Sequence, residues 1–185
     1  FWQGSQEIRE VSGESFKALA TEAARKLDLL LAEEIAHTAR IANDPVIIRA
    51  LEQRRDAQSD PKNPTTALTD FERRWTARDA AAIKSLTDNP LSTLLYEYFT
   101  GVHSAPGQLL PHVVRSSTKM LFLTDAQGTL VGTMTDHPAF RHQKTHWWQG
   151  AFNKAVGKLY IEDVRFDDQV NAYVFSISLP VMDSL

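Results

Sequence analysis

The chain has 185 residues, of which 43% are hydrophobic and 23% are charged. This composition is that of an ordinary globular protein, and the length fits one domain with a single core, so disordered, collagen-like and purely coiled-coil chains are excluded. Lys and Arg number 20 against 23 Asp and Glu, which gives a net charge of -3. Because there is no basic excess to neutralise phosphates, nucleic acid is not expected as a partner.

The sequence contains no cysteine. Thiol nucleophiles, zinc sites with Cys ligands, iron–sulfur clusters and disulfide frameworks are therefore excluded. No apolar run approaches the roughly 20 residues that span a bilayer, and no signal-peptide pattern is present. The chain begins at Phe1 rather than Met, so we expect a processed or excised segment from which flanking membrane spans are missing.

The first half of the sequence is predicted to be helical. From Gln6 to Arg55, apolar residues recur at intervals of three and four, with charged residues on the other face. The sequence Asn43-Asp44-Pro45 predicts a bend, with Asp44 as the cap of a second helix from Val46 to about Arg54. The apolar stripe consists of Phe16, Leu19, Ala20, Ala23, Leu27, Leu30, Leu31, Ile35, Thr38 and Ile41.

Two prolines and the lack of apolar periodicity predict a connector over residues 56–66. A helix is predicted from Thr69 or Asp70 through Leu86, ended by Asn89-Pro90, and another over residues 91–99. Residues 1–66 are thus expected to form an N-terminal region of long helix, short helix and connector, separate from a module over residues 67–185.

The second half changes to the period of β-strands. Two strands, 119–124 and 129–134, flank the turn sequence Asp125-Ala126-Gln127-Gly128, which predicts a hairpin. Two more strands, 158–164 and 172–180, surround a polar turn at 167–169, and a turn with a short helix lies between the hairpins over 140–156. Helices followed by a small antiparallel sheet predict an α+β fold.

The spacing of His142 and His146 is the one pattern that resembles a metal site, with Asp136 and His137 nearby. No Glu stands beside the first His, and Lys144 lies between the two imidazoles and would repel a cation, so packing is the favoured interpretation and no metal or cofactor is expected. The alternative is a metal-dependent hydrolase that uses His142, His146 and Asp136. The sequence has no Gly-x-Ser-x-Gly elbow and no phosphate-binding Gly-rich loop.

The neighbouring residues Trp147 and Trp148 are harder to explain by packing alone. Adjacent residues on a helix point about 100° apart, so both rings cannot enter the same core slot. Tryptophan combines a large apolar face with a hydrogen-bond donor, which suits a pocket for a small polar molecule. The alternative is that one ring is core and the other covers the sheet.

Four blocks of sequence, taken in order, resemble a known family. Residues 120–132, 147–152, 157–164 and 173–183 resemble the Cache sensor domains, the extracytoplasmic PAS-like modules of bacterial receptors. The long amphipathic helix before them, and the Trp75 helix leading to Asn89-Pro90, also resemble the double-module form of that family. The resemblance therefore covers most of the chain.

The resemblance implies a fold and a function. The fold is a long N-terminal helix that rises from a membrane span and packs on a membrane-distal PAS-like module with a five-stranded antiparallel sheet. Such modules lie on the periplasmic face of the inner membrane, bind amino acids, carboxylates or amines, and signal to a cytoplasmic kinase, cyclase or chemotaxis output. The domain itself is not expected to be an enzyme. Its helix stripe could also pack against a twin helix in a homodimer.

The resemblance also implies a set of ligand-binding residues. We expect an anionic or zwitterionic ligand under the loop from Asp136 to Lys144, stacked on a tryptophan, with Lys144 or a protonated histidine near its negative group and Asp163 near any ammonium. The full set comprises Asp136, His142, Lys144, His146, Trp147, Trp148, Tyr160 and Asp163.

The sequence departs from the family pattern in two places. Members that bind amino acids carry an Arg just before the aromatic pair, to hold the ligand carboxylate, where this chain has Thr145-His146. The family sheet also continues after the Pro-Val-x-Asp block into a last strand, so the module is expected to be truncated at Leu185. A ligand-free interaction module, with both tryptophans buried, remains the main alternative to a sensor.

Overall fold

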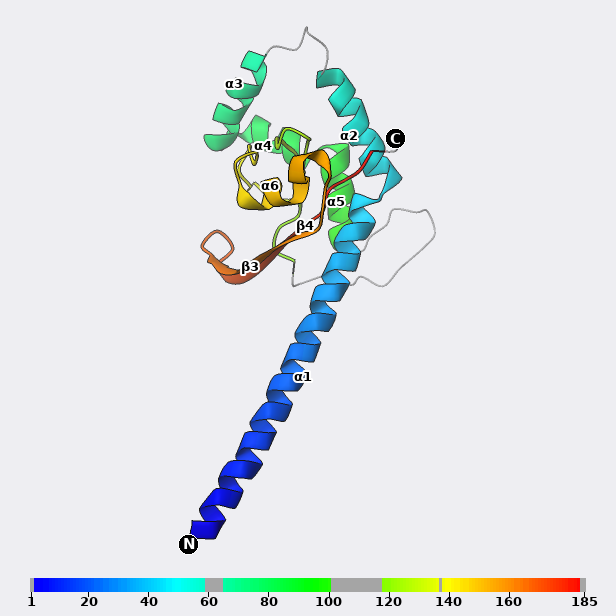
Figure 1. Ribbon diagram of the computed structural model, residues 1–185. Coiled ribbons are helices and arrows are strands. Elements are labelled where there is room, and N and C mark those ends of the chain that lie inside the picture. The colour runs from blue at the N-terminus through cyan, green and yellow to red at the C-terminus, as the bar shows by residue number, and fades with distance from the viewer. Residues whose placement is uncertain (1, 59–64, 101–117, 137, 184–185) are drawn as a thin grey trace, which may run out of the picture. The chain divides into compact units, whose positions relative to one another are not determined.

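The computed structural model describes residues 2–58, 65–100, 118–136 and 138–183 (Figure 1). The chain divides into two compact units, unit 1 (Phe1–Thr38) and unit 2 (Ala39–Leu185). The elements are α1 (Trp2–Ala42), α2 (Pro45–Gln58), α3 (Thr65–Thr76), α4 (Ala80–Thr87), α5 (Pro90–Thr100), β1 (Phe122–Thr124), β2 (Leu130–Thr133), α6 (His146–Phe152), a 3-10 turn (Asn153–Ala155), β3 (Tyr160–Asp167) and β4 (Ala172–Ser178).

The long first helix and its bend are confirmed. Helix α1 runs unbroken to Ala42, and α2 begins at Pro45. The Asp44 carboxylate accepts the backbone N–H of Val46 at 2.7 Å, which is the capping role expected from the sequence. The Tyr98 hydroxyl donates to the other carboxylate oxygen at 2.6 Å, so α5 is tied to the bend between α1 and α2.

The helix expected from residue 69 to 86 is instead two helices, α3 and α4. Asp79 ends the continuity, because its carboxylate accepts the backbone N–H of Ala82 at 2.9 Å and caps α4. Arg78, just before it, adopts a left-handed backbone with φ of 59°. The pKa of Asp79 is lowered by the Ala82 N–H and then by the Arg74 guanidinium.

Both expected hairpins are confirmed as antiparallel pairs, and the fold is α+β. Strand β1 pairs with β2, and β3 pairs with β4. Within the residues that the structure describes, the strands form two separate two-stranded sheets rather than the five-stranded sheet that the family resemblance implied. The first turn has the expected form, since Gly128 N–H donates to the Asp125 carbonyl at 2.9 Å and Gly128 has φ of 75°.

The β1–β2 hairpin is buried on both faces and divides the core of unit 2 in two. On one side lies the Ile41 cluster, which comprises Ile41, Ile47, Leu91, Leu95 and Val131, with Leu121 and Leu123 packed against it. On the other side lies the Trp75 cluster, which comprises Trp75, Leu86, Leu130 and Phe140, with Phe122 packed against it. Successive strand residues therefore enter opposite clusters, as the two-residue period of a strand requires.

Helix α5 approaches β2 closely because of two small residues. A Cβ on Gly132 would lie 3.0 Å from Leu91 Cβ and 3.2 Å from Ser92 Oγ, so glycine leaves room for the helix. Ser92 is 2% exposed, donates its hydroxyl to the Leu86 carbonyl at 2.5 Å and accepts the Thr133 N–H at 2.9 Å. One hydroxyl thus joins α4, α5 and β2.

The boundary between the units differs from the expected boundary after residue 66. Unit 2 begins at Ala39 and therefore includes the end of α1 and all of α2. The reason is that Ile41 and Ile47 are 3% and 0% exposed in the same cluster as Leu95 and Val131.

Replacing Ser92 with Ala should destabilise unit 2 by about 1–3 kcal/mol, because the Thr133 N–H would lose its acceptor in a buried position and the Leu86 carbonyl would keep only the Asn89 amide as a side-chain donor. For a chain of this size, the unfolding midpoint should fall by about 2–4 °C per kcal/mol. The matched control is Ser85→Ala, since Ser85 is exposed and donates only to a carbonyl of its own helix. Calorimetry that gave equal midpoints for the two variants would contradict the role of Ser92.

Candidate functional site

The segment before α6 is pinned to the first hairpin. The Leu130 N–H donates to the Phe140 carbonyl at 2.8 Å, and the His142 N–H donates to the Gly128 carbonyl at 2.7 Å. A Cβ on Gly128 would lie 2.6 Å from the backbone nitrogen of Gln143, so only glycine permits this approach. The Trp75 indole N–H also donates to the Pro138 carbonyl at 2.9 Å. These bonds fix the position of the His142 backbone.

The His142 side chain is buried among aromatic rings, with 5% of its surface exposed. Its ring lies 5.0 Å from the ring of Phe122 at an interplanar angle of 25°, and 5.0 Å from that of Trp147 at 53°. Both ring nitrogens are inaccessible, and neither forms a hydrogen bond of acceptable geometry. Burial lowers the pKa of His142, and the nearby Ala139 carbonyl offsets part of this effect. The ring is therefore uncharged near neutral pH, in contrast to the expected cationic role.

The two adjacent tryptophans have different partners, as their helical spacing predicts. Trp147 meets Phe122 edge to face, with ring centroids 5.6 Å apart, and also contacts His142. Trp148 stacks on Phe152, with centroids 4.6 Å apart at 14°. Both tryptophans are half-buried, so the structure brings together His142 and Trp147 of the expected set, and adds Phe122, which the sequence did not single out.

Three other residues of the expected set are not part of this ring contact. Lys144 and His146 are exposed. The Asp136 carboxylate forms an ion pair with Arg78 at 3.2 Å, and the Arg78 guanidinium also donates to the Asp136 carbonyl. Asp136 thus fastens the loop to the turn between α3 and α4.

The hydrolase alternative needs His142, His146 and Asp136 to converge, and the structure gives no sign of this. Helix α6 begins at His146, so the two histidines do not share a helix face. Among the described residues no three His, Asp or Glu side chains form a group that could hold a metal ion. His137, the fourth residue of that interpretation, lies outside the described residues.

The β3–β4 hairpin has one polar and one apolar face. Tyr160 pairs with Ser178 and Glu162 with Ser176, so these four side chains share a half-buried face. The register shifts between Glu162 and Arg165, and the intervening Asp163 is exposed. The carboxylate on the Tyr160 face is therefore that of Glu162 rather than Asp163, because Glu162 lies two residues along the strand from Tyr160, before the register shift.

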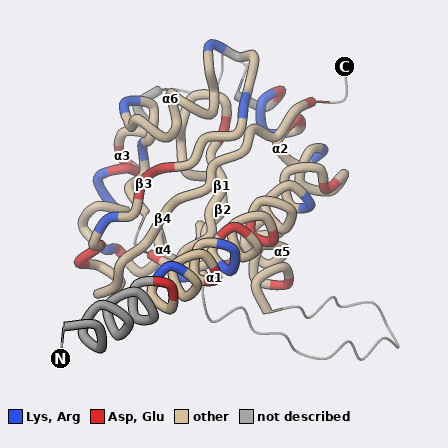
Figure 2. The backbone as a smooth tube through the Cα atoms, turned by 60° about the horizontal axis from the view of Figure 1, so that its bottom comes forward, with Lys and Arg blue, Asp and Glu red and all other residues tan. Residues whose placement is uncertain are grey.

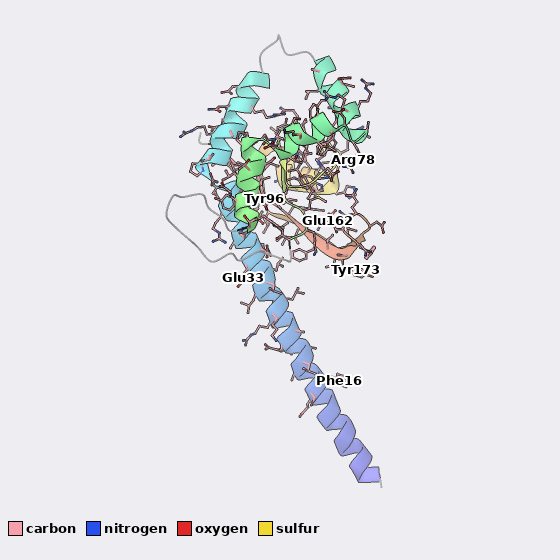
Figure 3. The ribbon with its side chains drawn as sticks, turned by 180° about the vertical axis from the view of Figure 1, so that it is seen from behind. Phe16, Glu33, Arg78, Tyr96, Glu162 and Tyr173 are labelled. Atoms are coloured by element: carbon pink, nitrogen blue, oxygen red, sulfur yellow. The ribbon has the colours of Figure 1, made fainter. Side chains whose placement is uncertain are left out.

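Glu162 is held in an unusual environment on that face. Its side chain is 26% exposed, and Arg165 Nε lies 3.7 Å from its Oε2. The same oxygen is buried and forms no hydrogen bond. Figure 3 places the side chain on β3, with Tyr173 at the far end of the hairpin. A buried carboxylate oxygen with one distant cation has unused capacity to accept a hydrogen bond.

The opposite face of the β3–β4 hairpin carries large apolar side chains that are exposed. Tyr173 is 78% exposed and its cross-strand partner Phe166 is 48% exposed, with their rings 5.3 Å apart. Ile161 and Phe175 lie on the same face. The hairpin thus presents its polar residues inward and its apolar residues outward.

Helix α6 contacts the polar face through a glycine. A Cβ on Gly150 would lie 2.3 Å from Cδ2 of Tyr160, so the tyrosine ring rests directly on the helix backbone. Helix α6 therefore contacts β1 through Trp147 and β3 through Gly150.

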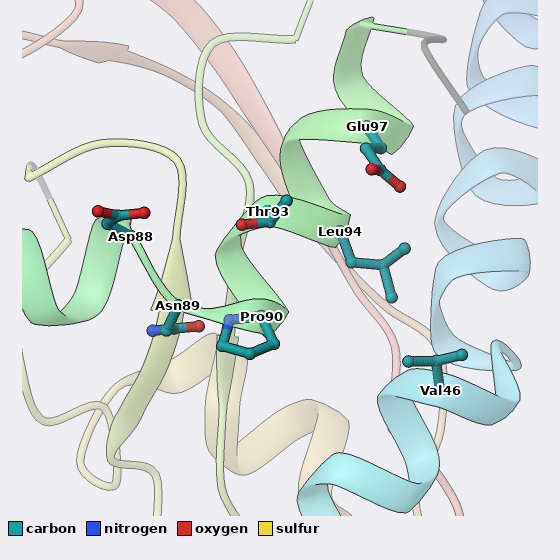
Figure 4. Close-up of a pocket in the computed structure, with 7 residues that line it drawn as sticks. All are labelled: Val46, Asp88, Asn89, Pro90, Thr93, Leu94 and Glu97. Carbon is teal, nitrogen blue, oxygen red and sulfur yellow. The ribbon is translucent and has the colours of Figure 1, made fainter. Parts of the chain in front are cut away.

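Unit 2 also has an open groove of about 460 Å³ that the sequence did not indicate (Figure 4). Its apolar lining comes from Val46, Pro90 and Leu94, and the carboxylates of Asp88 and Glu97 lie at its rim. The groove is broadly open to solvent, whereas small-molecule sites enclose most of the ligand surface. The signal in the sequence that could have indicated this groove is the spacing of residues 90, 93, 94 and 97, which places them on one face of α5.

Helices α1, α2 and α3 and strand β3 each carry charges of both signs, whereas Lys84 is the charged residue of α4 (Figure 2). Among the described residues, no helix combines the length and the apolar character that crossing a membrane requires.

Comparison with known proteins gave no match: no family model, no curated protein and no solved structure is significantly similar to the chain.

Replacing Gly150 with Ala should destabilise the protein by about 1–3 kcal/mol, because the new methyl group would overlap the Tyr160 ring. A decrease in the free energy of unfolding would be informative, because Ala in a helix is otherwise favoured over Gly by about 1 kcal/mol. The control Gln149→Ala, at an exposed neighbouring position, should be nearly neutral. In a double-mutant cycle with Tyr160→Ala, the two changes should be strongly non-additive; additive effects measured by urea unfolding would disprove the contact.

Proposed function

We propose that this chain is the extracytoplasmic small-molecule-sensing domain of a bacterial transmembrane receptor, of the Cache type, with no catalytic activity of its own. In this proposal the domain lies on the periplasmic face of the inner membrane. Binding of a small polar ligand changes its conformation, and an output domain outside these residues, such as a kinase, cyclase or chemoreceptor module, responds.

The observation that carries the proposal is the two-sided packing of β1. Phe122 contacts the rings of His142 and Trp147 on one side. Its neighbours Leu121 and Leu123 pack on the opposite side against the cluster that contains Ile41, near the end of α1. A ligand that shifts Trp147 would shift β1 as well. The C-terminal end of α1, a helix of 41 residues, would then shift with β1.

The chemistry around α6 supports a ligand with both polar and apolar parts. Trp147 and Phe122 offer aromatic surface, and Glu162 and Tyr160 offer polar groups on the strand that α6 covers. Lys144 and His146, exposed at the start of α6, supply donors for a carboxylate. We therefore keep carboxylates, amino acids and amines as the ligand class, with Glu162 in place of Asp163 as the partner of an ammonium group.

A panel of amino acids, dicarboxylates, monocarboxylates and amines should contain a compound that raises the unfolding midpoint. At a concentration 100 times the Kd, the stabilisation is about 2.7 kcal/mol, which corresponds to a rise of about 5–10 °C. The rise should disappear in Trp147→Ala and should be retained in Tyr173→Ala, an aromatic residue that is 78% exposed. If Trp147→Ala bound the compound with unchanged affinity, the site assignment would be wrong.

A second candidate function is a ligand-free dimerisation module, and the surface of unit 1 favours it. In unit 1, taken by itself, all side chains from residue 14 to 30 are exposed. They include Phe16 at 71%, Leu19 at 67%, Leu27 at 60% and Leu30 at 57%, which lie on the expected stripe (Figure 3). Large apolar stripes on a helix are suited to a second helix, so we propose that two copies of α1 pair along it.

Replacing Leu27 with Asp should weaken this dimer about tenfold or more, because a carboxylate would be buried between the helices. The matched control is Leu29→Asp, since Leu29 is 58% exposed but lies off the stripe. Sedimentation equilibrium should show a monomer for the first variant and a dimer for the second. A wild-type chain that stays monomeric at high micromolar concentration would rule out the pairing.

A further inference from the structure

The buried position of the His142 imidazole makes its protonation costly, and this property is independent of ligand binding. It is 5% exposed, and both of its nitrogens are enclosed without a hydrogen bond. A neutral imidazole loses about 1–3 kcal/mol in such a setting for an unpaired polar group, but an imidazolium loses considerably more, because charge is far more costly to bury. Burial therefore favours the neutral ring, and the Ala139 carbonyl offsets only part of this effect.

Among the described residues, burial and the Ala139 carbonyl are the influences on the pKa of His142, and no carboxylate contributes to it. On the β1 side, the first ionisable group is Asp125, whose carboxylate accepts the backbone N–H groups of Gln127 at 3.0 Å and Thr129 at 2.8 Å. In the segment that carries His142, Arg141 is a cation whose Nε lies 2.6 Å from Glu72. The other cation close in sequence, Lys144, is exposed and would repel rather than stabilise an imidazolium.

We propose that protonation of His142 detaches α6 from β1. In mildly acidic solution, the imidazolium leaves the space between Phe122 and Trp147, and α6 loses its packing on β1. The ring can move alone, because its backbone is held by hydrogen bonds to Gly128 and from Thr145. The stimulus is then acidity rather than an organic ligand. The inference needs no ligand, so it stands apart from the proposed sensing function.

The direction of the pH dependence follows from burial. The pKa of His142 is lowered in the folded protein, so the unfolded chain takes up the proton first, near pH 6.5. The stability that the neutral ring contributes is complete above that value and is lost as the pH falls through the folded pKa. In this window the unfolding equilibrium constant should rise by up to about tenfold per pH unit.

The test compares three proteins from pH 8 to pH 5 by urea unfolding without any ligand. The wild type should show the rise in the unfolding constant, and His142→Phe, which keeps an aromatic ring but cannot take up a proton, should show a much smaller one. His146→Gln removes an exposed histidine four residues away and should follow the wild type. A His142→Phe curve as steep as that of the wild type would overturn the proposal.

A second measurement tests release of α6 and does not depend on whether His142→Phe folds. In the wild type, NMR titration of the His142 ring protons should give a pKa below 6.5. Hydrogen exchange at pH 5.5 should show α6 amides opening more often than those of α5, after correction for intrinsic rates. A ring that titrates at or above pH 6.5, or equal opening of the two helices, refutes the switch while leaving the ligand-sensing proposal untouched.

Discussion

The structure of unit 2 depends on a short hairpin that is buried on both faces. Strand β2 sends Leu130 into the Trp75 cluster and Val131 into the Ile41 cluster, and both side chains are almost fully enclosed. A strand with this environment cannot exchange its two faces by a one-residue slip, because each side chain would enter the wrong cluster. Gly132 and Ser92 then fix how near α5 can come. The helices around the hairpin therefore have little freedom to rearrange separately.

The aromatic contact of Phe122, His142 and Trp147 lies beside this hairpin. It contains the His142 imidazole, whose two nitrogens are buried without a hydrogen-bond partner. Apolar packing alone would be served better by a leucine or phenylalanine at position 142. A buried imidazole without partners reduces stability, and such a group in a folded protein calls for an explanation. His142 belongs to the proposed ligand site and is the centre of the proposed response to acid, and the two proposals can fail independently.

The sequence predicted what short-range chemistry decides and missed what depends on packing. The Asp44 cap, the turn with Gly128 and the divergence of Trp147 and Trp148 follow from local rules, and each is found in the structure. The break at Asp79 was missed, because an N-cap inside an apolar run has the same composition as a helix interior. The roles of Phe122 and the neutral His142 arise from burial, which has no signature in one sequence, whereas strand alternation from Tyr160 would have placed Glu162 on the Tyr160 face.

Helix α6 joins two parts of unit 2 whose polarity is arranged differently. On one side Trp147 reaches a hairpin that is buried on both faces, and on the other the Gly150 backbone supports Tyr160 of a hairpin whose apolar face is outward. A two-stranded hairpin has little stability of its own, so the position of β3–β4 depends on α6. Displacement of Trp147, by a ligand or by a proton on His142, would therefore change the packing of two regions. One contains Glu162 and Ser176, and the other contains Leu121 and Leu123. The candidate site and the core are coupled because the seven-residue helix α6 contacts both.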